Sequence, residues 1–185
     1  MTVFKVFKQT FSLVCVLIIS STPVNAQSFN QAAVASAHPE ATRAGIEILK
    51  QGGNAFDAAA AVTASLAVVE PYGSGIGGGA FWLLHIADQN RQIMIDGREK
   101  APMLAHKDMY LDKSGHVIDG LSLNGPMAAG IPGVPAGIDR LVKRYGRLSL
   151  KEVLAPEIKQ AKEGCHVADR YRKLMGCRQQ VVQSH

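Results

Sequence analysis

From Asn54 to Val69 the chain reads NAFDAAAAVTASLAVV. Asparagine is a strong helix N-cap, and an acid in the first turn, here Asp57, interacts favourably with the helix dipole. Beyond it, only Thr63 and Ser65 interrupt the apolar residues, so the predicted helix has no polar face. A helix that is apolar all round must be covered by other elements. The stretch therefore predicts a buried helix inside a layered protein.

The flanking residues predict a helix on one side and a β-hairpin on the other. Glu40–Gln51 is expected to be helical, with Pro39 at its first position and a glycine pair after its end. After the buried helix, Gly73–Gly79 predicts a loop. The bulky apolar run Ala80–Ile86 predicts a strand, and Gln92–Asp96 is expected to pair back as the second strand.

The rest of the chain adds helices and one further strand candidate. Val34–Ser36 is a possible short strand, and Pro102–Gly130 predicts irregular structure. Helices are expected from Pro135, from the capping box of Ser149 with Glu152 (with a restart at Pro156), and over Ala168–Gln183. Helices covering a hairpin indicate a layered α/β fold. So small a sheet is marginal alone, and further strands are expected outside this sequence.

Residues 1–26 are expected to be a secretory signal peptide. Lys5 and Lys8 precede the apolar run Phe11–Ile19, and small residues precede a cut after Ala26. A membrane anchor would need about 20 apolar residues, which this run does not reach. The prediction is an exported protein, periplasmic or extracellular, with residues 27–185 as an incomplete domain and no membrane anchor.

Composition argues against several kinds of site. The predicted mature part has 18 Lys and Arg against 15 Asp and Glu, without a basic stripe that carries aromatics, so nucleic acid is not an expected partner. No histidine or cysteine spacing fits a metal, and no cofactor is indicated. Cys165 and Cys177 pair or remain separate thiols; spacing does not decide which.

The run Gly73-Ser74-Gly75-Ile76-Gly77-Gly78 has the spacing of a dinucleotide fingerprint. That fingerprint needs a strand to enter the loop and a helix to leave it. Here a helix enters and a strand leaves, so we interpret the glycines as positions of close backbone packing.

Arg98 is the candidate binding residue. It follows the second predicted strand, where site residues are often displayed, and guanidinium suits bidentate recognition of a carboxylate. The alternative is a solvated arginine paired with Asp96 or Glu99. No catalytic residue is predicted: Thr42 and Thr63 both fall inside expected helices, so neither is a free amino-terminal nucleophile.

Several blocks in one order resemble the γ-glutamyltransferase (glutathione hydrolase) family, over about Val34 to Tyr171. They are Pro39-Glu40-Ala41, Gly52-Gly53-Asn54-Ala55-Phe56-Asp57-Ala58-Ala59, Glu70-Pro71, Gly75-Ile76-Gly77-Gly78-Gly79-Ala80-Phe81, Asp96-Gly97-Arg98-Glu99-Lys100-Ala101-Pro102, Gly130-Ile131-Pro132-Gly133-Val134-Pro135-Ala136-Gly137, Tyr145-Gly146 and Ala155-Pro156.

The resemblance implies a partial αββα N-terminal-nucleophile hydrolase fold, export, and a precursor that cuts itself into a large and a small subunit. It implies that Arg98 binds the α-carboxylate of γ-glutamyl compounds such as glutathione. The family's threonine nucleophile, and most oxyanion and amine contacts, belong to the small subunit, which this sequence is expected to lack. The chain alone is therefore expected to be inactive.

Two hypotheses remain open from the residues. One is an incomplete γ-glutamyltransferase, with a glutaryl-type amide acylase as the alternative substrate class. The other is an exported binding module without catalysis.

Overall fold

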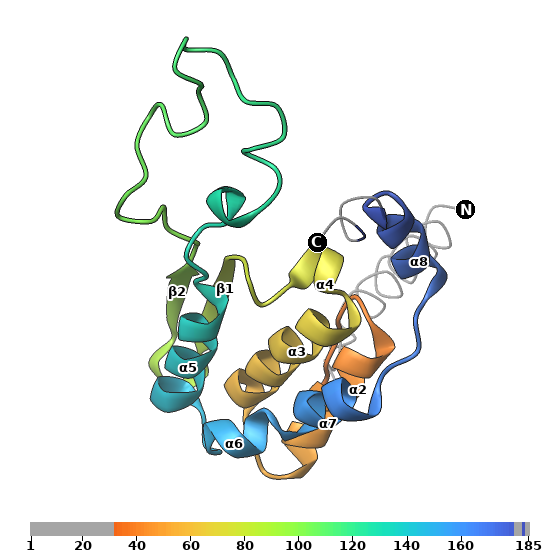
Figure 1. Cartoon of the computed structure of the whole chain (residues 1–185). Coiled ribbons are helices and arrows are strands. Elements are labelled where there is room, and N and C mark those ends of the chain that lie inside the picture. The colour runs from red at the N-terminus through yellow and green to blue at the C-terminus, as the bar shows by residue number, and fades with distance from the viewer. Residues whose placement is uncertain (1–31, 180–182, 184–185) are drawn as a thin grey trace, which may run out of the picture. The chain divides into compact units, whose positions relative to one another are not determined.

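The computed structural model describes residues 32–179 and residue 183. The predicted signal peptide, residues 1–26, lies outside the described residues. Within residues 32–179, no helix combines the length and the apolar composition that crossing a bilayer requires. In this part of the chain, helices pack against one face of a single hairpin (Figure 1).

The helices, in chain order, are α2 (Pro39–Lys50), α3 (Ala55–Val69), α4 (Pro71–Ser74), α5 (Val134–Tyr145), α6 (Leu150–Val153), α7 (Ala155–Glu163) and α8 (Asp169–Gly176). Two 3₁₀ turns, η1 (Ala87–Gln89) and η2 (Pro126–Ala128), lie in connections. The strands are β1 (Ala80–Ile86) and β2 (Arg91–Gly97).

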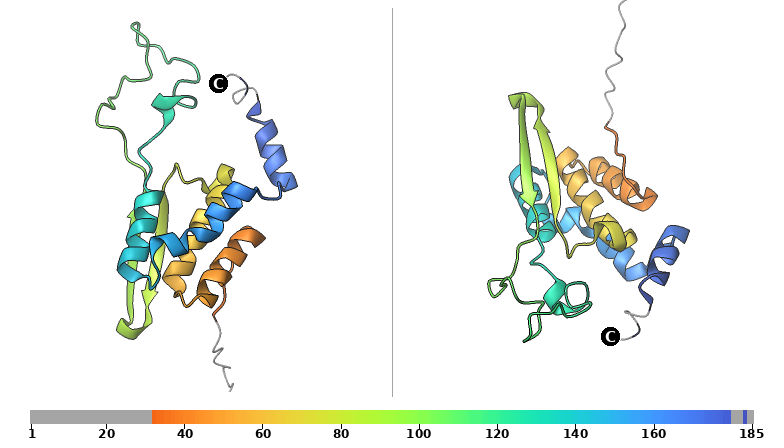
Figure 2. Two further views of the ribbon diagram at one scale, coloured as in Figure 1. Left: turned by 60° about the horizontal axis from the view of Figure 1, so that its bottom comes forward. Right: turned by 90° about the horizontal axis from the view of Figure 1, so that it is seen from above.

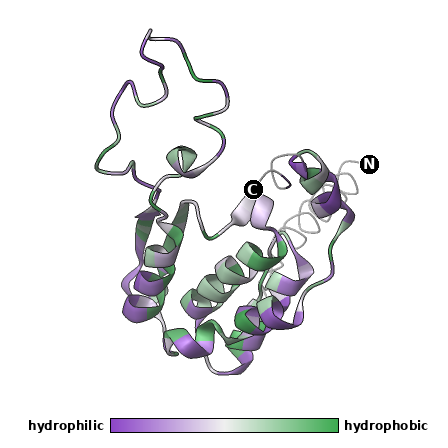
Figure 3. Ribbon diagram, viewed as in Figure 1, coloured by the Kyte–Doolittle hydropathy of each residue, from purple (hydrophilic) through white to green (hydrophobic). Residues whose placement is uncertain are grey.

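The helix α3 is the centre of the packing, as its sequence predicts. It begins at a reciprocal capping box, in which Asn54 accepts from the backbone of Asp57 and the Asp57 carboxylate accepts from Asn54. The helices α2, α5, α6 and α7 all contact it. Figure 3 shows the apolar colouring along α3 between these neighbours. Ala60, Ala61 and Ala64 are buried, and their small side chains allow this close cover.

The hairpin pairs Ala80 with Gly97 at its open end and Ile86 with Arg91 at its turn. Asn90 takes the left-handed conformation there, with φ 43°, which asparagine tolerates better than most residues. Side chains alternate between two faces. Trp82, Leu84 and Ile95 are buried on the face that joins the helical core. The opposite face is exposed.

Two glycines allow helices to approach their neighbours closely. A methyl group at Gly45 of α2 would lie 2.7 Å from Val62 of α3. A methyl group at Gly137 of α5 would collide with the ring of Trp82. Views from other directions show α3 between α2 and α5, with α5 beside the hairpin (Figure 2). The two glycines therefore set how closely α2 packs on α3 and how closely α5 packs on β1.

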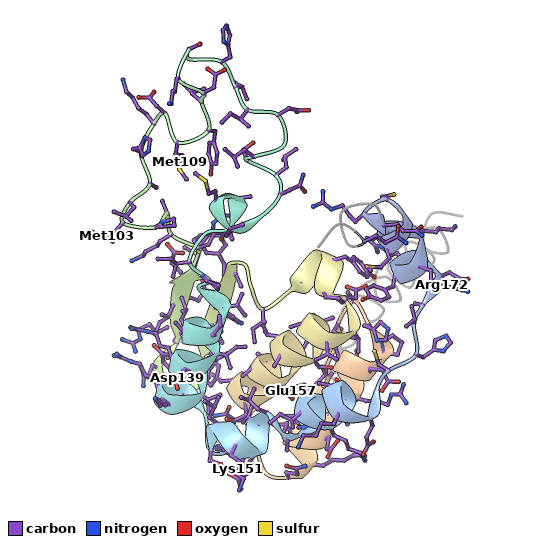
Figure 4. The ribbon with its side chains drawn as sticks, in the orientation of Figure 1. Met103, Met109, Asp139, Lys151, Glu157 and Arg172 are labelled. Atoms are coloured by element: carbon purple, nitrogen blue, oxygen red, sulfur yellow. The ribbon has the colours of Figure 1, made fainter. Side chains whose placement is uncertain are left out.

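Residues 101–130 form an irregular excursion from the base of α5 and β2, with Met103 and Met109 along it (Figure 4). Its base is closed by backbone pairing of Lys100 with Ile131, and a second bridge joins Leu111 to Val117. The predicted irregular structure is confirmed here, apart from the short turn η2.

Three local predictions need correction. The possible strand at Val34–Ser36 is not a strand; Val34 instead packs its side chain near Gly45, where an added methyl would lie 3.0 Å away. The first residues of the expected glycine loop belong to α4, since proline is favourable at a first helical position. The expected helix Ala168–Gln183 is interrupted: α8 ends at Gly176, a weak helix former, and Cys177 and Arg178 form a turn before the helical residues Gln179 and Gln183.

Candidate functional site

Three backbone segments meet where Arg98 follows β2. They are the glycine loop 75–79, residues 97–100 and residues 130–134. The N–H groups of Gly133 and Val134 both donate to Gly78 O, at 3.1 and 3.2 Å. Lys100 and Ile131 exchange backbone hydrogen bonds of 3.1 and 2.8 Å. These hydrogen bonds therefore hold the backbone in place on both sides of Arg98.

Two glycines in this junction touch the backbone around Arg98. A methyl group at Gly79 would collide with the Glu99 carboxylate and lie 2.9 Å from Arg98 Cα. A methyl group at Gly133 would collide with Gly97 O and lie 2.7 Å from Arg98 O. Only glycine fits such contacts without displacing the backbone. The glycine loop thus has the packing role that the sequence predicts.

The Arg98 side chain is exposed over 62% of its surface, and both acids named as possible partners contact this residue. Its Nε lies 3.5 Å from Glu99 Oε2. Its backbone N–H donates to Asp96 Oδ1 at 2.9 Å. A guanidinium has five N–H donors, so one exposed ion pair leaves donors for a ligand.

Arg98 lines a pocket of about 420 Å³ between the end of β2 and the start of α5. Its charged lining residues are Asp96, Arg98, Lys100 and Arg140. Ile95, Ile131 and Pro132 are among its apolar lining residues. Three cations against one carboxylate suit a negatively charged ligand.

A larger hollow of about 620 Å³ lies under the glycine loop and is lined by Tyr72, Phe81 and Trp82 among others. It has no cationic lining residue, and Arg98 does not reach it. Burial raises the pKa of Tyr72, and its hydrogen bond to Glu70 adds to that shift. We place the candidate site at the smaller pocket, because it contains Arg98 and two further cations, whereas the larger hollow has none.

The hydroxyls of both threonines in the described part of the chain are engaged in hydrogen bonds. Thr63 Oγ1 donates to Ala59 O at 2.8 Å and accepts from Trp82 Nε1 at 3.2 Å. Thr42 belongs to α2, and its Oγ1 lies 2.7 Å from the Oγ of Ser36, which precedes that helix. Among residues 32–179, no cluster of three metal-ligating side chains occurs. Cys165 and Cys177, the cysteines in this part of the chain, are both free thiols.

The gamma-glutamyltranspeptidase family model matches residues 41–184 of the chain. The chain belongs to the gamma-glutamyltranspeptidase family. The glutathione hydrolase proenzyme of Pseudomonas aeruginosa is 41% identical over 162 residues, which is 88% of this chain and 29% of that relative. The chain thus spans less than a third of that relative's length.

Solved structures agree with this assignment. The Helicobacter pylori gamma-glutamyltranspeptidase superposes with a TM-score of 0.79 and 39% identity, covering 83% of this chain and 44% of that one. The cephalosporin acylase of Bacillus halodurans gives a TM-score of 0.71 and 30% identity, covering 88% and 32%. These neighbours confirm the predicted partial N-terminal-nucleophile hydrolase fold, in which the hairpin is only part of the sheet system.

Sequence reasoning found Arg98 but missed its cationic neighbours in this gamma-glutamyltranspeptidase chain. Lys100 and Arg140 line the same pocket. A signal for Arg140 was present, since it lies three and four residues after Gly137 and Ala136 and therefore shares their helix face. What the sequence lacked was evidence that this face meets the end of β2.

Proposed function

We propose that this chain is the carboxylate-binding part of an enzyme that transfers or hydrolyses γ-glutamyl groups, with Arg98 as the residue that binds the donor's α-carboxylate. The family match carries the proposal, because it extends through the segment that displays Arg98. The exposed guanidinium and the cationic pocket around it support the same role.

The chemistry that Arg98 would supply is recognition, without bond cleavage. A hydrogen bond to a charged group contributes about 1.5–3 kcal/mol, and the exposure of this guanidinium favours the lower part of that range. Lysine would keep the charge but lose the planar fork. The small subunit of the same precursor would supply the threonine nucleophile, and glutathione is one donor that fits this arrangement.

The test is a chimera in which residues 32–179 replace the matching segment of the Pseudomonas aeruginosa proenzyme. We expect Arg98→Ala to lower kcat/KM for a γ-glutamyl anilide by about ten- to thirtyfold, and Arg98→Lys to recover part of that loss. The control is Arg91→Ala, at the exposed start of the same strand. An unchanged kcat/KM in Arg98→Ala would remove Arg98 from the site.

A glutaryl-type amide acylase is the second candidate, and the likeness to a cephalosporin acylase favours it. Arg98 would bind the terminal carboxylate of a glutaryl group as well as it binds an α-carboxylate. The two donors differ by the α-ammonium group. The rates at which the chimera hydrolyses γ-glutamyl and glutaryl anilides distinguish the two activities. If the folded, processed chimera hydrolyses neither donor, a non-catalytic binding module is favoured.

By itself, the 185-residue chain is proposed to have no turnover. The hydroxyls of Thr42 and Thr63 are engaged within helices and cannot act as amino-terminal nucleophiles. Purified chain should release no more aniline from a γ-glutamyl anilide than a heat-killed sample. Release above that background would contradict the proposal.

Export is the remaining part of the proposal, on the pattern of residues 1–26. Mass spectrometry of the exported protein should give a mature chain that starts at Gln27. Recovery of Met1 in the exported pool would exclude the cleavage.

A further inference from the structure

We propose that Arg140 is a second carboxylate-binding residue in the pocket of Arg98, which makes this pocket selective for γ-glutamyl peptides that end in a free carboxylate. The inference rests on the proposed role of Arg98 and goes beyond it. It names which donors are preferred and a residue that selects them.

The two arginines come from different elements on the same pocket. Arg98 follows β2, and Arg140 lies in the middle of α5. The relation between these elements is fixed by Gly137, which packs against the ring of Trp82. Gly97, the last residue of β2, also touches this ring, since a methyl there would lie 2.6 Å from it. Arg140 therefore has a defined position relative to Arg98.

Arg140 is the cation of α5 whose charge has no partner in the described residues. Lys143 on the same helix is paired with Asp139 at 2.9 Å. The Arg144 guanidinium lies over the Tyr145 ring, 6.0 Å from its centroid. Within residues 32–179, Arg140 makes neither an ion pair nor a side-chain hydrogen bond. Its charge is available to a ligand that enters the pocket.

The ionic groups of this pocket are unevenly paired. Arg98 is already paired with Glu99, and Asp96 accepts from the Arg98 backbone. Lys100 and Arg140 add two cations to the lining, and neither has an ion-pair partner between residues 32 and 179. One α-carboxylate at Arg98 would leave Arg140 without a counter-charge. A second carboxylate on the same ligand would supply one.

The size of the pocket agrees with a small peptide. Its volume of about 420 Å³ falls in the usual range for small-molecule sites, about 300–1,000 Å³. Ile131 and Pro132 offer an apolar surface for the aliphatic part of such a ligand. A γ-glutamyl tripeptide has one carboxylate at each end and an uncharged middle. A γ-glutamyl anilide has only the first carboxylate.

The experiment is a titration of the ¹⁵N-labelled chain followed by NMR, with S-methylglutathione and its glycine ethyl ester as probes. The ester keeps the α-carboxylate and removes the charge at the other end. Trp82 is the single tryptophan of the chain, so its indole N–H signal is unambiguous. Because its ring contacts Gly97 and Gly137 of the pocket wall, that signal reports both the fold of each variant and occupancy.

We expect Arg140→Ala to raise the Kd of S-methylglutathione about three- to tenfold and to leave the Kd of the ester unchanged. Arg98→Ala should raise the Kd of both probes. Arg144→Ala removes an equal charge from the same helix and should change neither.

Equal effects of Arg140→Ala on both probes, or no effect on either, would overturn the inference while leaving the role of Arg98 intact. If Arg98→Ala changes neither Kd, the proposed role of Arg98 fails instead. Absence of binding by the folded wild-type chain to either probe would overturn both.

Discussion

Glu157 is a buried carboxyl group without a hydrogen-bond partner among the described residues. It lies on α7, which packs against α3 (Figure 4), and only 6% of the residue is exposed. Burial raises the pKa of Glu157 from 4.5 to about 7. Loss of hydration disfavours the ionised carboxylate there by more than the backbone N–H of Glu157 itself favours it, so the folded chain favours the protonated form.

This shift predicts how the stability of the chain depends on pH. Between about pH 4.5 and pH 7 the unfolded chain releases the Glu157 proton while the folded chain keeps it. The free energy of unfolding should therefore be highest at the acid end of this window and fall by about 2–3 kcal/mol toward pH 7. Urea unfolding at several pH values measures it, at protein concentrations low enough to avoid association.

The matched variants for this prediction lie on the same helix. Glu157→Gln should remove most of the fall, because glutamine does not titrate. Glu163→Gln changes an exposed carboxylate 4.0 Å from Lys159 and should leave the fall in place. A wild-type chain as stable at pH 7 as at pH 5 would show that Glu157 is hydrated in solution.

At the scale of elements, the contact of α5 with β1 is set by a glycine. Gly137 touches the ring of Trp82, whose Nε1 donates to Thr63 of α3 at 3.2 Å. One tryptophan therefore joins a strand to two helices. Any side chain at position 137 must displace the ring or move α5 away from the hairpin.

Gly137→Ala should lower the free energy of unfolding by about 1–3 kcal/mol, although alanine is the better helix former. Gly176 is also helical, but a methyl group there meets nothing within 4 Å. Gly176→Ala should leave stability unchanged or raise it by up to about 1 kcal/mol. Thermal unfolding of both variants, followed by Trp82 fluorescence, measures the difference. Equal midpoints would mean that the ring is not packed against α5.

At the scale of the whole molecule, the hairpin has one apolar face without cover from the described residues. Phe81, Leu83 and Met94 are exposed over 54, 74 and 64% of their surface. Contiguous apolar patches bind hydrophobic dyes and promote association, and a two-stranded sheet has two open edges. The chain should therefore bind such a dye and self-associate as its concentration rises.

Leu83→Ser should reduce dye fluorescence and shift the association to higher concentration, since it removes the most exposed of the three side chains. Leu104→Ser serves as the control, because Leu104 is 90% exposed in the excursion 101–130, away from the hairpin. Analytical ultracentrifugation at several concentrations gives the comparison. If both variants changed dye fluorescence and association equally, the association would depend on total exposed apolar surface and not on this face of the hairpin.

The sequence was most informative where the chemistry is local. Asn54 and Ser149 form capping boxes with acids three residues away, and a new helix includes Pro156 in its first turn. It was least informative where short segments depend on neighbours. The apolar run at Val34–Ser36 has no strand to pair with in the described residues and packs against α2 instead.

By itself, the sequence determined the buried helix, the hairpin, the family and the place of Arg98 after a strand, because these depend on patterns within a few neighbouring residues. Only the tertiary structure decided what surrounds Arg98. Gly79 and Gly133 are distant in the chain, yet both closely approach the backbone of Arg98. Arg140 lines the same pocket as Arg98. Such contacts follow from how closely whole segments can pack, which no local pattern specifies.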